Sequence, residues 1–262
     1  MLAPERRRYL LQELSVRETV RVSEVAHTLQ VSEMTVRRDI DALDGEGVLR
    51  KVHGGATRLR GTQEAEPGFS VNLGRQRQAK LAIGRAARDL LRPGATIAIS
   101  AGTTTYCLAG LLAGLEGLTV VTNSLTGADV ARRSTGGEAT VILTGGERTP
   151  SEALVGPVAT AAIRSLHVDI CFLGVHGIHP EGGLSTPNLA EADTNAALAE
   201  SADRLVVLAD HTKFGLRALA PIVPLAAVDT LITDAGIPDG VRSSYADLGV
   251  NLLLASGTGE PA

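Results

Sequence analysis

Several kinds of residue and motif are scarce or absent in this chain of 262 residues. Aromatic residues make up 2% and tryptophan is missing, which disfavours single-stranded nucleic-acid binding because that function depends on stacking against aromatic rings. The chain has no run of eighteen apolar residues, and its N-terminal apolar stretch is too short for a signal peptide. A cytoplasmic location and no membrane partner are therefore expected. Neither GxGxxG nor GxxxxGKS/T occurs, so no cofactor is predicted.

The chain has only two cysteines, Cys107 and Cys171. Both lie among apolar residues, and neither belongs to a CxxC motif or to a Cys/His spacing typical of zinc sites. The pattern predicts two buried free thiols in a reducing compartment, with no disulfide and no metal site.

Charge is distributed unevenly along the chain. The net charge is −4, but residues 1–60 carry 11 Lys and Arg against 9 Asp and Glu, whereas residues 61–262 carry 14 against 20. The basic excess is thus confined to the N-terminal part, where a polyanionic partner is expected to bind.

The segment from Val22 to Gly55 predicts two short helices joined by a turn and followed by a basic strand pair. Apolar residues in the first helix recur at spacings of three and four, and Ser32 is placed to cap the second helix. In the second helix the residues predicted to face inward are Met34, Val36, Ile40 and Leu43. Residues 48–53 predict a basic wing that ends at Gly54 and Gly55.

Hydroxyl and guanidinium groups on such a second helix match base edges and phosphates in the major groove. The predicted DNA contacts are Ser32, Thr35, Arg37, Arg38, Arg50, Lys51 and His53. A solvated surface hairpin is the alternative, but the ordered series of cap, helix, glycine stop and basic hairpin is more specific. The segment predicts a winged helix-turn-helix that binds double-stranded operator DNA.

The rest of the chain predicts a second domain after a linker. A first helix is expected over residues 4–15, and a polar, glycine-bearing stretch follows Gly55. The predicted boundaries are 1–57 for the DNA-binding domain, 58–74 for the linker and 75–257 for an effector-sensing and oligomerisation domain.

From Ala95 onward, short apolar strands alternate with helices, which predicts an α/β domain with a mostly parallel sheet covered on both faces. The predicted strands are 96–100, 119–122, 140–144, 170–175, 204–209, 231–233 and 251–255. The predicted helices are 80–91, 104–114, 125–134, 155–166, 190–201 and 239–248.

Glycines, hydroxyls and one lysine follow the carboxyl ends of these strands, where ligands bind in such sheets. The predicted effector-binding residues are Gly102, Thr103, Thr104, Thr105, Asn123, Ser124, Gly145, Gly146 and Lys213. Backbone N–H groups of 102–105 would hold an anion, with Lys213 adding charge. A small phosphorylated sugar or polyol suits this hydroxyl-rich lining.

Ordered motifs give the chain a resemblance to a known family. They are VSEMTVRRDIDAL, RKVHGGA, AGTTT, VVTNSL, LTGG, FLGVHGI, GLSTPNLAEA, LADHTKFG and LITD. The chain resembles the DeoR family of bacterial transcriptional regulators from about Pro4 to Ala255. The resemblance implies a C-terminal sensor domain related in fold to ribose-5-phosphate isomerase. It also implies a homodimeric or homotetrameric repressor of a carbohydrate-catabolic operon, modulated by a phosphorylated sugar.

Two positions differ from the family pattern. Ser100 stands where an Asp usually precedes the Gly-Thr-Thr-Thr loop, and Asn195 stands where a Lys usually follows the Glu matched by Glu191. An isomerase-like enzyme with an appended DNA-binding domain is the alternative function. Its candidate acids, Glu191, Asp193 and Asp210, lack a clear partner, and His176 and His179 are expected to be loop residues. No catalytic residue is predicted, and a sensor is favoured over an enzyme.

Overall fold

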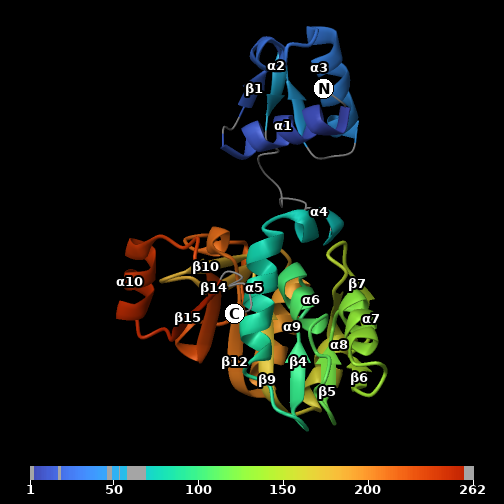
Figure 1. The fold of residues 1–262 in the computed structure, drawn as a ribbon, viewed down its shortest axis with the longest axis vertical. Coiled ribbons are helices and arrows are strands. Elements are labelled where there is room, and N and C mark those ends of the chain that lie inside the picture. Colours follow the sequence, from blue (N-terminus) through green and yellow to red (C-terminus); the bar gives the residue numbers. More distant parts are fainter. Residues whose placement is uncertain (1–2, 17–18, 46–48, 53, 58–68, 257–262) are drawn as a thin grey trace, which may run out of the picture. The chain divides into compact units, whose positions relative to one another are not determined.

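The computed structural model describes residues 3–16, 19–45, 49–52, 54–57 and 69–256. The chain divides into two compact units, Met1–Ala65 and Glu66–Ala262, each with its own hydrophobic core (Figure 1). Part of the expected linker lies outside the described residues, and its last six residues form the helix α4 (Phe69–Gly74). The boundaries at 57 and 74 stay predictions.

The N-terminal unit combines a three-helix bundle with a small antiparallel sheet in the strand order β1-β3-β2. Its elements are α1 (Ala3–Val16), β1 (Thr19–Arg21), α2 (Val22–Leu29), α3 (Glu33–Gly45), β2 (Arg50–Val52) and β3 (Gly55–Thr57). The turn between α2 and α3 passes through Gln30, which takes the left-handed conformation at φ 52. The winged helix-turn-helix is confirmed, and β1 is a third strand that the sequence pattern did not predict.

The core of this unit corrects one prediction about α3. Val36, Ile40 and Leu43 are buried, whereas Met34 is 56% exposed, so the prediction that Met34 faces inward is wrong. Helix α3 packs against both α1 and α2. Its buried face is therefore wider than that of a helix with one neighbour, and it includes Val36. Met34, in the first turn, projects away from that face.

The C-terminal unit is built on a seven-stranded, fully parallel sheet in the order β15-β14-β12-β9-β4-β5-β6. Its strands are β4 (Thr96–Ile99), β5 (Thr119–Thr122), β6 (Thr140–Leu143), β9 (Val168–Gly174), β12 (Ala202–Leu208), β14 (Thr230–Asp234) and β15 (Leu252–Ala255). All seven predicted strands are therefore present, with ends that differ from the predicted ones by at most two residues.

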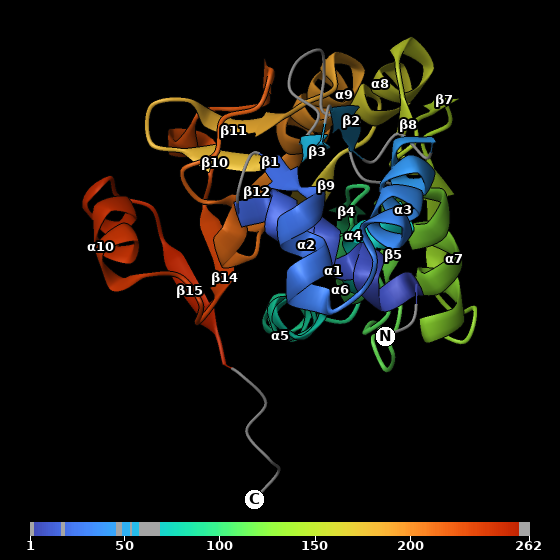
Figure 2. The same cartoon turned by 90° about the horizontal axis from the view of Figure 1, so that it is seen from above.

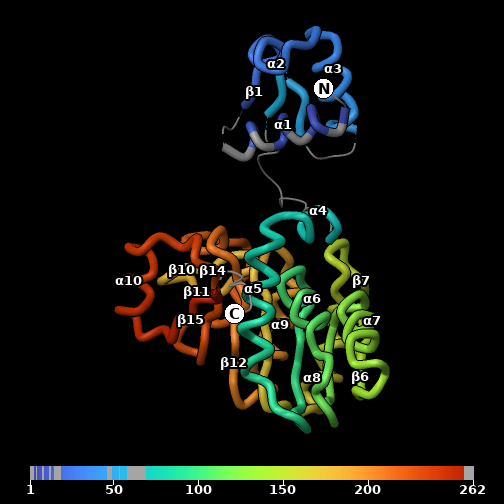
Figure 3. The backbone as a smooth tube through the Cα atoms, viewed as in Figure 1, coloured from blue at the N-terminus to red at the C-terminus, as the bar shows by residue number. Residues whose placement is uncertain are grey.

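Helices cover both faces of this sheet, as predicted. They are α5 (Arg77–Arg88), α6 (Thr103–Ala109), α7 (Leu125–Ser134), α8 (Pro157–Arg164), α9 (Leu189–Glu200) and α10 (Asp239–Asp247). Alternate residues of one strand enter different cores: Ile97 and Ile99 pack with α5 and α6, whereas Ala98 packs in the cluster that contains residues of α8 and α9. Figures 2 and 3 show α10 beside β15 at one edge of the sheet and α7 at the other.

Short antiparallel strands extend the C-terminal unit. They are β7 (Glu147–Arg148), β8 (Leu154–Val155), β10 (Gly177–His179), β11 (Gly183–Thr186) and β13 (Ala220–Pro221). None was predicted, because two to four residues are too few to show a period of two. His179 lies in β10, so its assignment to a loop is wrong. Its Nδ1 atom accepts the N–H groups of Glu181 and Gly182 in the β10–β11 turn, each at 3.2 Å.

Both cysteines are buried and free, which confirms the predicted thiols. Cys171 lies at the centre of β9, and burial raises its pKa to about 12. Cys107 lies in α6, and burial raises its pKa as well. In the described part of the chain, no helix has the length and apolar character needed to cross a membrane.

Candidate functional site

The start of α3 is organised by Ser32. Its Oγ atom accepts the N–H of Thr35 at 3.2 Å, as expected of a helix cap, and lies 2.9 Å from the Thr35 hydroxyl. Ser32 is exposed and Thr35 is partly exposed. Both predicted contact residues are thus at the surface, with their hydroxyls oriented by the capping bond.

Arg37 and Arg38 are both exposed on α3, but their surroundings differ. The Nη2 atom of Arg37 lies 2.9 Å from a carboxylate oxygen of Glu33, one turn earlier, and both side chains are about half exposed. Within the described residues, Arg38 forms no ion pair or side-chain hydrogen bond. Arg38 is therefore available to an incoming anion, whereas Arg37 has to leave Glu33 first.

The wing supplies two more predicted contacts, Arg50 and Lys51, on β2. Both are exposed, and the Nζ atom of Lys51 lies 2.5 Å from Asp41 of α3. The Lys51 N–H also donates to Asp44 at 2.9 Å, which fastens the wing to α3. His53, the remaining predicted contact, lies outside the described residues.

Asp39 was not identified from the sequence, although it holds the DNA-binding unit together. It is buried on α3, and its carboxylate lies 2.7 Å from Arg6 Nε and 3.6 Å from Arg7 Nε on α1. In the sequence, an Asp that follows two arginines is expected to be exposed. Asp39 is buried because α1 packs across this part of α3, and that packing cannot be read from the sequence of α3 alone.

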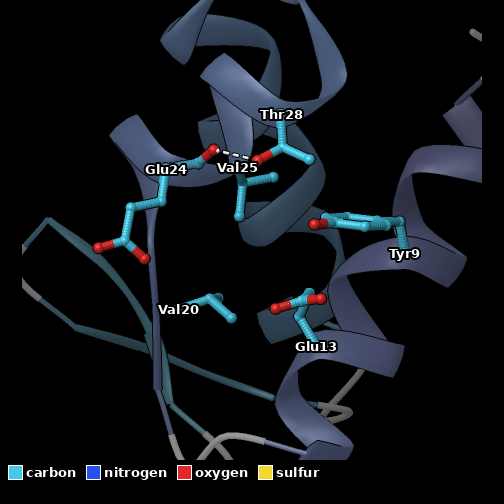
Figure 4. A pocket seen from close by; sticks show the side chains of 6 residues that line it. All are labelled: Tyr9, Glu13, Val20, Glu24, Val25 and Thr28. Carbon is cyan, nitrogen blue, oxygen red and sulfur yellow. Dashed lines mark hydrogen bonds between the residues drawn. The ribbon is translucent and has the colours of Figure 1, made fainter.

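A small pocket of about 120 Å³ lies between α1 and α2 in this unit (Figure 4). It is lined by Tyr9, Glu13, Val20, Glu24, Val25 and Thr28. Two carboxylates among six lining residues disfavour an anionic ligand by like-charge repulsion. We therefore do not assign the pocket to a phosphorylated effector.

The predicted effector residues lie at the carboxyl edge of the large sheet, in loops, in the first turn of α6 and, for Lys213, in a short 3-10 turn. Residues 102–105 follow β4, 123–124 follow β5, 145–146 follow β6, and Lys213 follows β12. Because the strands are parallel, these loops share one edge, and hydrogen bonds join the central ones directly. Ser100 Oγ accepts the N–H of Gly174 at 2.9 Å, and the Ala101 N–H donates to Asn123 Oδ1 at 2.7 Å.

The Gly-Thr-Thr-Thr loop opens α6. Gly102 is its N-cap at φ 152, and a Cβ there would lie 3.2 Å from Thr105 Oγ1. The Thr105 hydroxyl donates to the Gly102 carbonyl at 3.0 Å, while Thr103 is partly exposed and Thr104 is buried. The loop is therefore stabilised internally, with Thr103 the most accessible of its three hydroxyls to solvent.

Asn123 and Ser124 have roles within the fold. The Asn123 amide donates to the Leu154 carbonyl at 3.2 Å while its oxygen accepts from Ala101. Ser124 caps α7 by accepting the N–H of Gly127 at 2.9 Å. Both are buried, so their polar groups position the loops around the carboxyl edge.

Gly145 and Gly146 also have structural roles. Their φ angles are 71 and 116, in the region that favours glycine. A Cβ on Gly146 would lie 2.4 Å from the Val155 carbonyl oxygen of β8. The second glycine therefore permits the close approach of β8, and the first faces α8 through Val158, whose Cγ1 would lie 3.6 Å from an added Cβ.

A second lysine accompanies Lys213 and was missed in the sequence. Lys80, in the first turn of α5, is buried at 4% exposure, and its Nζ atom donates to the Asn72 carbonyl of α4 at 2.5 Å. Burial is the largest influence and lowers the pKa of Lys80; the charge of Asp210 raises it and that of Lys213 lowers it. The amphipathic pattern of α5 gave no reason to expect a lysine on its buried side.

Glu191, the strongest candidate acid for an enzyme, is buried and accepts three hydroxyl hydrogen bonds. The donors are Thr149 at 3.0 Å, Thr186 at 3.2 Å and Ser151. Asp193 is exposed, and Asp210 caps the turn at Thr212. Glu191 and Asp210 accept hydrogen bonds from neighbouring residues of the fold, and Asp193 points to solvent, so these three acids do not form a catalytic pair.

The two positions that differ from the family pattern are both buried. Ser100 joins β4 to β9 through the hydrogen bond to Gly174 described above, and Asn195 lies in α9. The Ser100 hydroxyl thus accepts a hydrogen bond from a main-chain N–H group, and this bond does not need a carboxylate at position 100.

His211 and Asp234 form a further polar pair at the same edge. His211 Nδ1 lies 2.8 Å from Asp234 Oδ2, and the His211 N–H donates to the other carboxylate oxygen at 2.8 Å. Burial alone would raise the pKa of Asp234, but hydrogen bonds from His211 and the Gly236 N–H outweigh it, and the pKa is lowered. The pair joins the ends of β12 and β14.

Comparison with known proteins covers both units. A family model described as the DeoR C terminal sensor domain matches residues 75–235, and one described as the DeoR-like helix-turn-helix domain matches residues 6–62. The HTH-type transcriptional regulator GolR of Listeria innocua serovar 6a is 34% identical over 252 residues, which cover 96% of this chain and 98% of that protein.

The HTH-type transcriptional repressor CsqR of Escherichia coli strain K12 is 30% identical, over 94% of this chain and 93% of that protein. Among solved structures, ribose 5 phosphate isomerase A from Neisseria gonorrhoeae is similar with a TM-score of 0.37 and 14% identity, over 52% of each chain. The two curated relatives are named as regulators of transcription rather than as enzymes.

Proposed function

The chain belongs to the DeoR family of helix-turn-helix transcriptional regulators, and we propose that it represses a carbohydrate-catabolic operon in the cytoplasm. Its N-terminal unit binds double-stranded operator DNA, and its C-terminal unit senses a small phosphorylated metabolite. The name of CsqR, a repressor, supports the direction of control.

One observation carries the DNA-binding part: Ser32, Arg37 and Arg38 at the start of α3 are exposed, and Thr35 beside them is partly exposed. Exposed Met34 adds an apolar group suited to a thymine methyl. The test is operator selection with the full chain from a random duplex library, followed by footprinting. Protection of a defined inverted repeat supports the proposal, and binding with no sequence preference contradicts it.

The effector part rests on the carboxyl edge of the sheet. We place the anion at the N–H groups of 102–105 with Lys213, and we assign Asn123, Ser124, Gly145 and Gly146 to the walls of the site. The test measures thermal stabilisation of the full chain by triose, pentose and hexose phosphates, with each compound assayed for conversion. Saturable stabilisation without conversion supports a sensor, whereas turnover supports the enzyme alternative.

We also propose that the functional unit is a homodimer or homotetramer formed by the C-terminal units. Strand β6 supports this, because it ends the sheet and leaves Ile142 and Leu143 exposed at 36% and 45%. A symmetric pair of DNA-binding units can read half-sites about 34–36 Å apart. Sedimentation of the full chain tests it: Leu143→Asp should lower the mass of the particle, and a wild-type monomer would contradict the proposal.

A further inference from the structure

Asn195 carries a buried amide that has no hydrogen-bond partner. The residue is 7% exposed and lies in the second turn of α9. Within the described residues its side chain forms no hydrogen bond, although an amide offers two donors and an acceptor oxygen. In that part of the chain, the fully enclosed side-chain polar atoms without a partner are Arg7 Nε and Thr233 Oγ1. The Asn195 amide therefore keeps access to space beside α9, where a ligand could satisfy it.

The amide is a neighbour of the buried carboxylate of Glu191. The two residues are four positions apart on α9, so their side chains are adjacent on the surface of the helix. Side chains lean toward the N-terminus of their helix, which directs the Asn195 amide toward the turn that holds Glu191. Helix α9 lies in the connection from β9 to the parallel strand β12, so its N-terminus is at the carboxyl edge of the sheet. Both groups are therefore near the edge where the effector is proposed to bind.

Glu191 has no cation at ion-pair distance within the described residues. It is 8% exposed, and its two oxygens accept hydrogen bonds from the hydroxyls of Thr149, Ser151 and Thr186. A carboxylate has about four lone-pair sites, so three donors leave one site open. A buried charge is costly unless polar groups compensate it, and a further donor supplied by a ligand is therefore favourable.

The β7–β8 hairpin, which carries two of these hydroxyls, also contacts the loops of the proposed anion site. Its Ala153 forms a β-bridge with Ser124, and the Leu154 N–H donates to the Asn123 carbonyl at 2.7 Å. The Asn123 side chain in turn accepts the N–H of Ala101, next to the Gly-Thr-Thr-Thr loop. Helix α9 packs against β8, β11 and α8 (Figure 2). A continuous series of contacts thus joins the Gly-Thr-Thr-Thr loop to the elements around Glu191.

We propose that Glu191 and Asn195 bind one hydroxyl group of the effector, apart from its phosphate. The hydroxyl donates to the Glu191 carboxylate and accepts from the Asn195 amide, so one ligand group satisfies both. The inference rests on the proposed sensor function and deepens it, because it names residues that distinguish one sugar phosphate from another. A sugar without that hydroxyl leaves a carboxylate and an amide unpaired, and such a site discriminates strongly against it.

Asn195→Leu removes the amide and keeps a side chain of similar size. The variant is expected to fold, because an amide without a partner has no hydrogen bond to lose. It should bind the cognate sugar phosphate about three- to tenfold more weakly, the effect of one neutral hydrogen bond. Asn251→Leu is the matched control, since Asn251 directly precedes β15 at the opposite, amino edge of the sheet. This control should bind with wild-type affinity.

The experiment measures thermal shifts of the full chain with triose, pentose and hexose phosphates, and then with monodeoxy analogues of the compound that stabilises wild type most. In wild type, removal of one particular hydroxyl should weaken binding about tenfold or more. In Asn195→Leu, removal of that same hydroxyl should cost less than in wild type, because one of its partners is already absent. Removal of any other hydroxyl should cost the same in both proteins.

Two results overturn the inference: wild-type affinity of Asn195→Leu for the sugar phosphate, and additive losses at every hydroxyl. If Asn195→Leu does not fold, Asn195→Ala, which adds no atoms, replaces it in the same comparison with the same expectations. A wild-type protein that responds to no sugar phosphate contradicts the proposed sensor function itself, and the inference with it. These failures are distinguishable, because only the last one appears in the wild type.

Discussion

Glu33 is predicted to weaken operator binding by occupying Arg37. The carboxylate and the guanidinium are 2.9 Å apart on successive turns of α3, with side chains 51% and 52% exposed. An exposed pair at this spacing contributes about 0.3–0.5 kcal/mol, which DNA binding has to overcome before Arg37 can reach a base or phosphate. Glu33→Gln removes that cost and also one negative charge that faces the phosphates.

The first contribution alone corresponds to about a twofold decrease in Kd, and the second adds to it at low salt. Arg38 has no such competitor among the described residues. Arg38→Ala is therefore expected to cost about 1–3 kcal/mol, and Arg37→Ala less, by roughly the energy of its pair with Glu33. Anisotropy titrations of the full chain on one operator duplex, over a series of salt concentrations, measure all three values.

Glu24→Gln is the matched control, because Glu24 is also an exposed acid in the first turn of a helix, α2. An equal gain from both variants would mean a general charge effect. Weaker binding by folded Glu33→Gln would refute the reasoning, since it would show that Glu33 itself accepts a hydrogen bond from the DNA. Melting curves are needed beside the titrations, because losing an acid from the first turn of α3 costs about 0.3–1 kcal/mol of stability.

Three further predictions concern stability. Asp39→Ala removes the buried carboxylate that joins α3 to Arg6 of α1 at 2.7 Å and should destabilise the N-terminal unit by about 3 kcal/mol, seen as an early melting transition and lost operator binding. Gly146→Ala places a Cβ 2.4 Å from a main-chain oxygen and should lower the melting temperature of the C-terminal unit; an unchanged value would contradict that crowding. The lowered pKa of Asp234 stabilises the fold above the unfolded carboxyl pKa of about 3.9, and this contribution is lost as the pH falls through the folded value. The stability advantage of wild type over Asp234→Asn should therefore shrink on acidification, as measured by urea unfolding, and a constant difference would show that the His211 pair is not the cause.

Features that repeat along the chain were predictable from the sequence. The five inner strands of the parallel sheet are short apolar runs whose residues enter the cores on both faces, and most of the helices between the strands carry recurring apolar residues. The cap of α3 was equally visible, because Ser32 acts on a residue three positions away. Local patterns of this kind survive in any tertiary context that keeps the element.

Features that depend on contacts between distant segments were not predictable. Asp39 meets Arg6 across 33 positions, and Lys80 meets α4 through a main-chain carbonyl that has no sequence signature. Asn123 was expected at the effector, yet its amide oxygen and nitrogen are both bonded to the main chain of neighbouring loops. A polar residue after a strand has the same appearance in sequence whether it serves a ligand or the fold.

The two buried thiols can be used to measure how the C-terminal unit opens, because each is shielded from reagents in the folded protein. Only a thiolate attacks a disulfide reagent, so Cys171, at the centre of the sheet with a pKa of about 12, is modified only in molecules whose sheet has come apart. Cys107, in the short helix beside the Gly-Thr-Thr-Thr loop, becomes reachable when α6 alone detaches. The ratio of the labelling rates of Cys107 and Cys171 therefore distinguishes local opening at the carboxyl edge from global unfolding. The measurement needs no introduced probe.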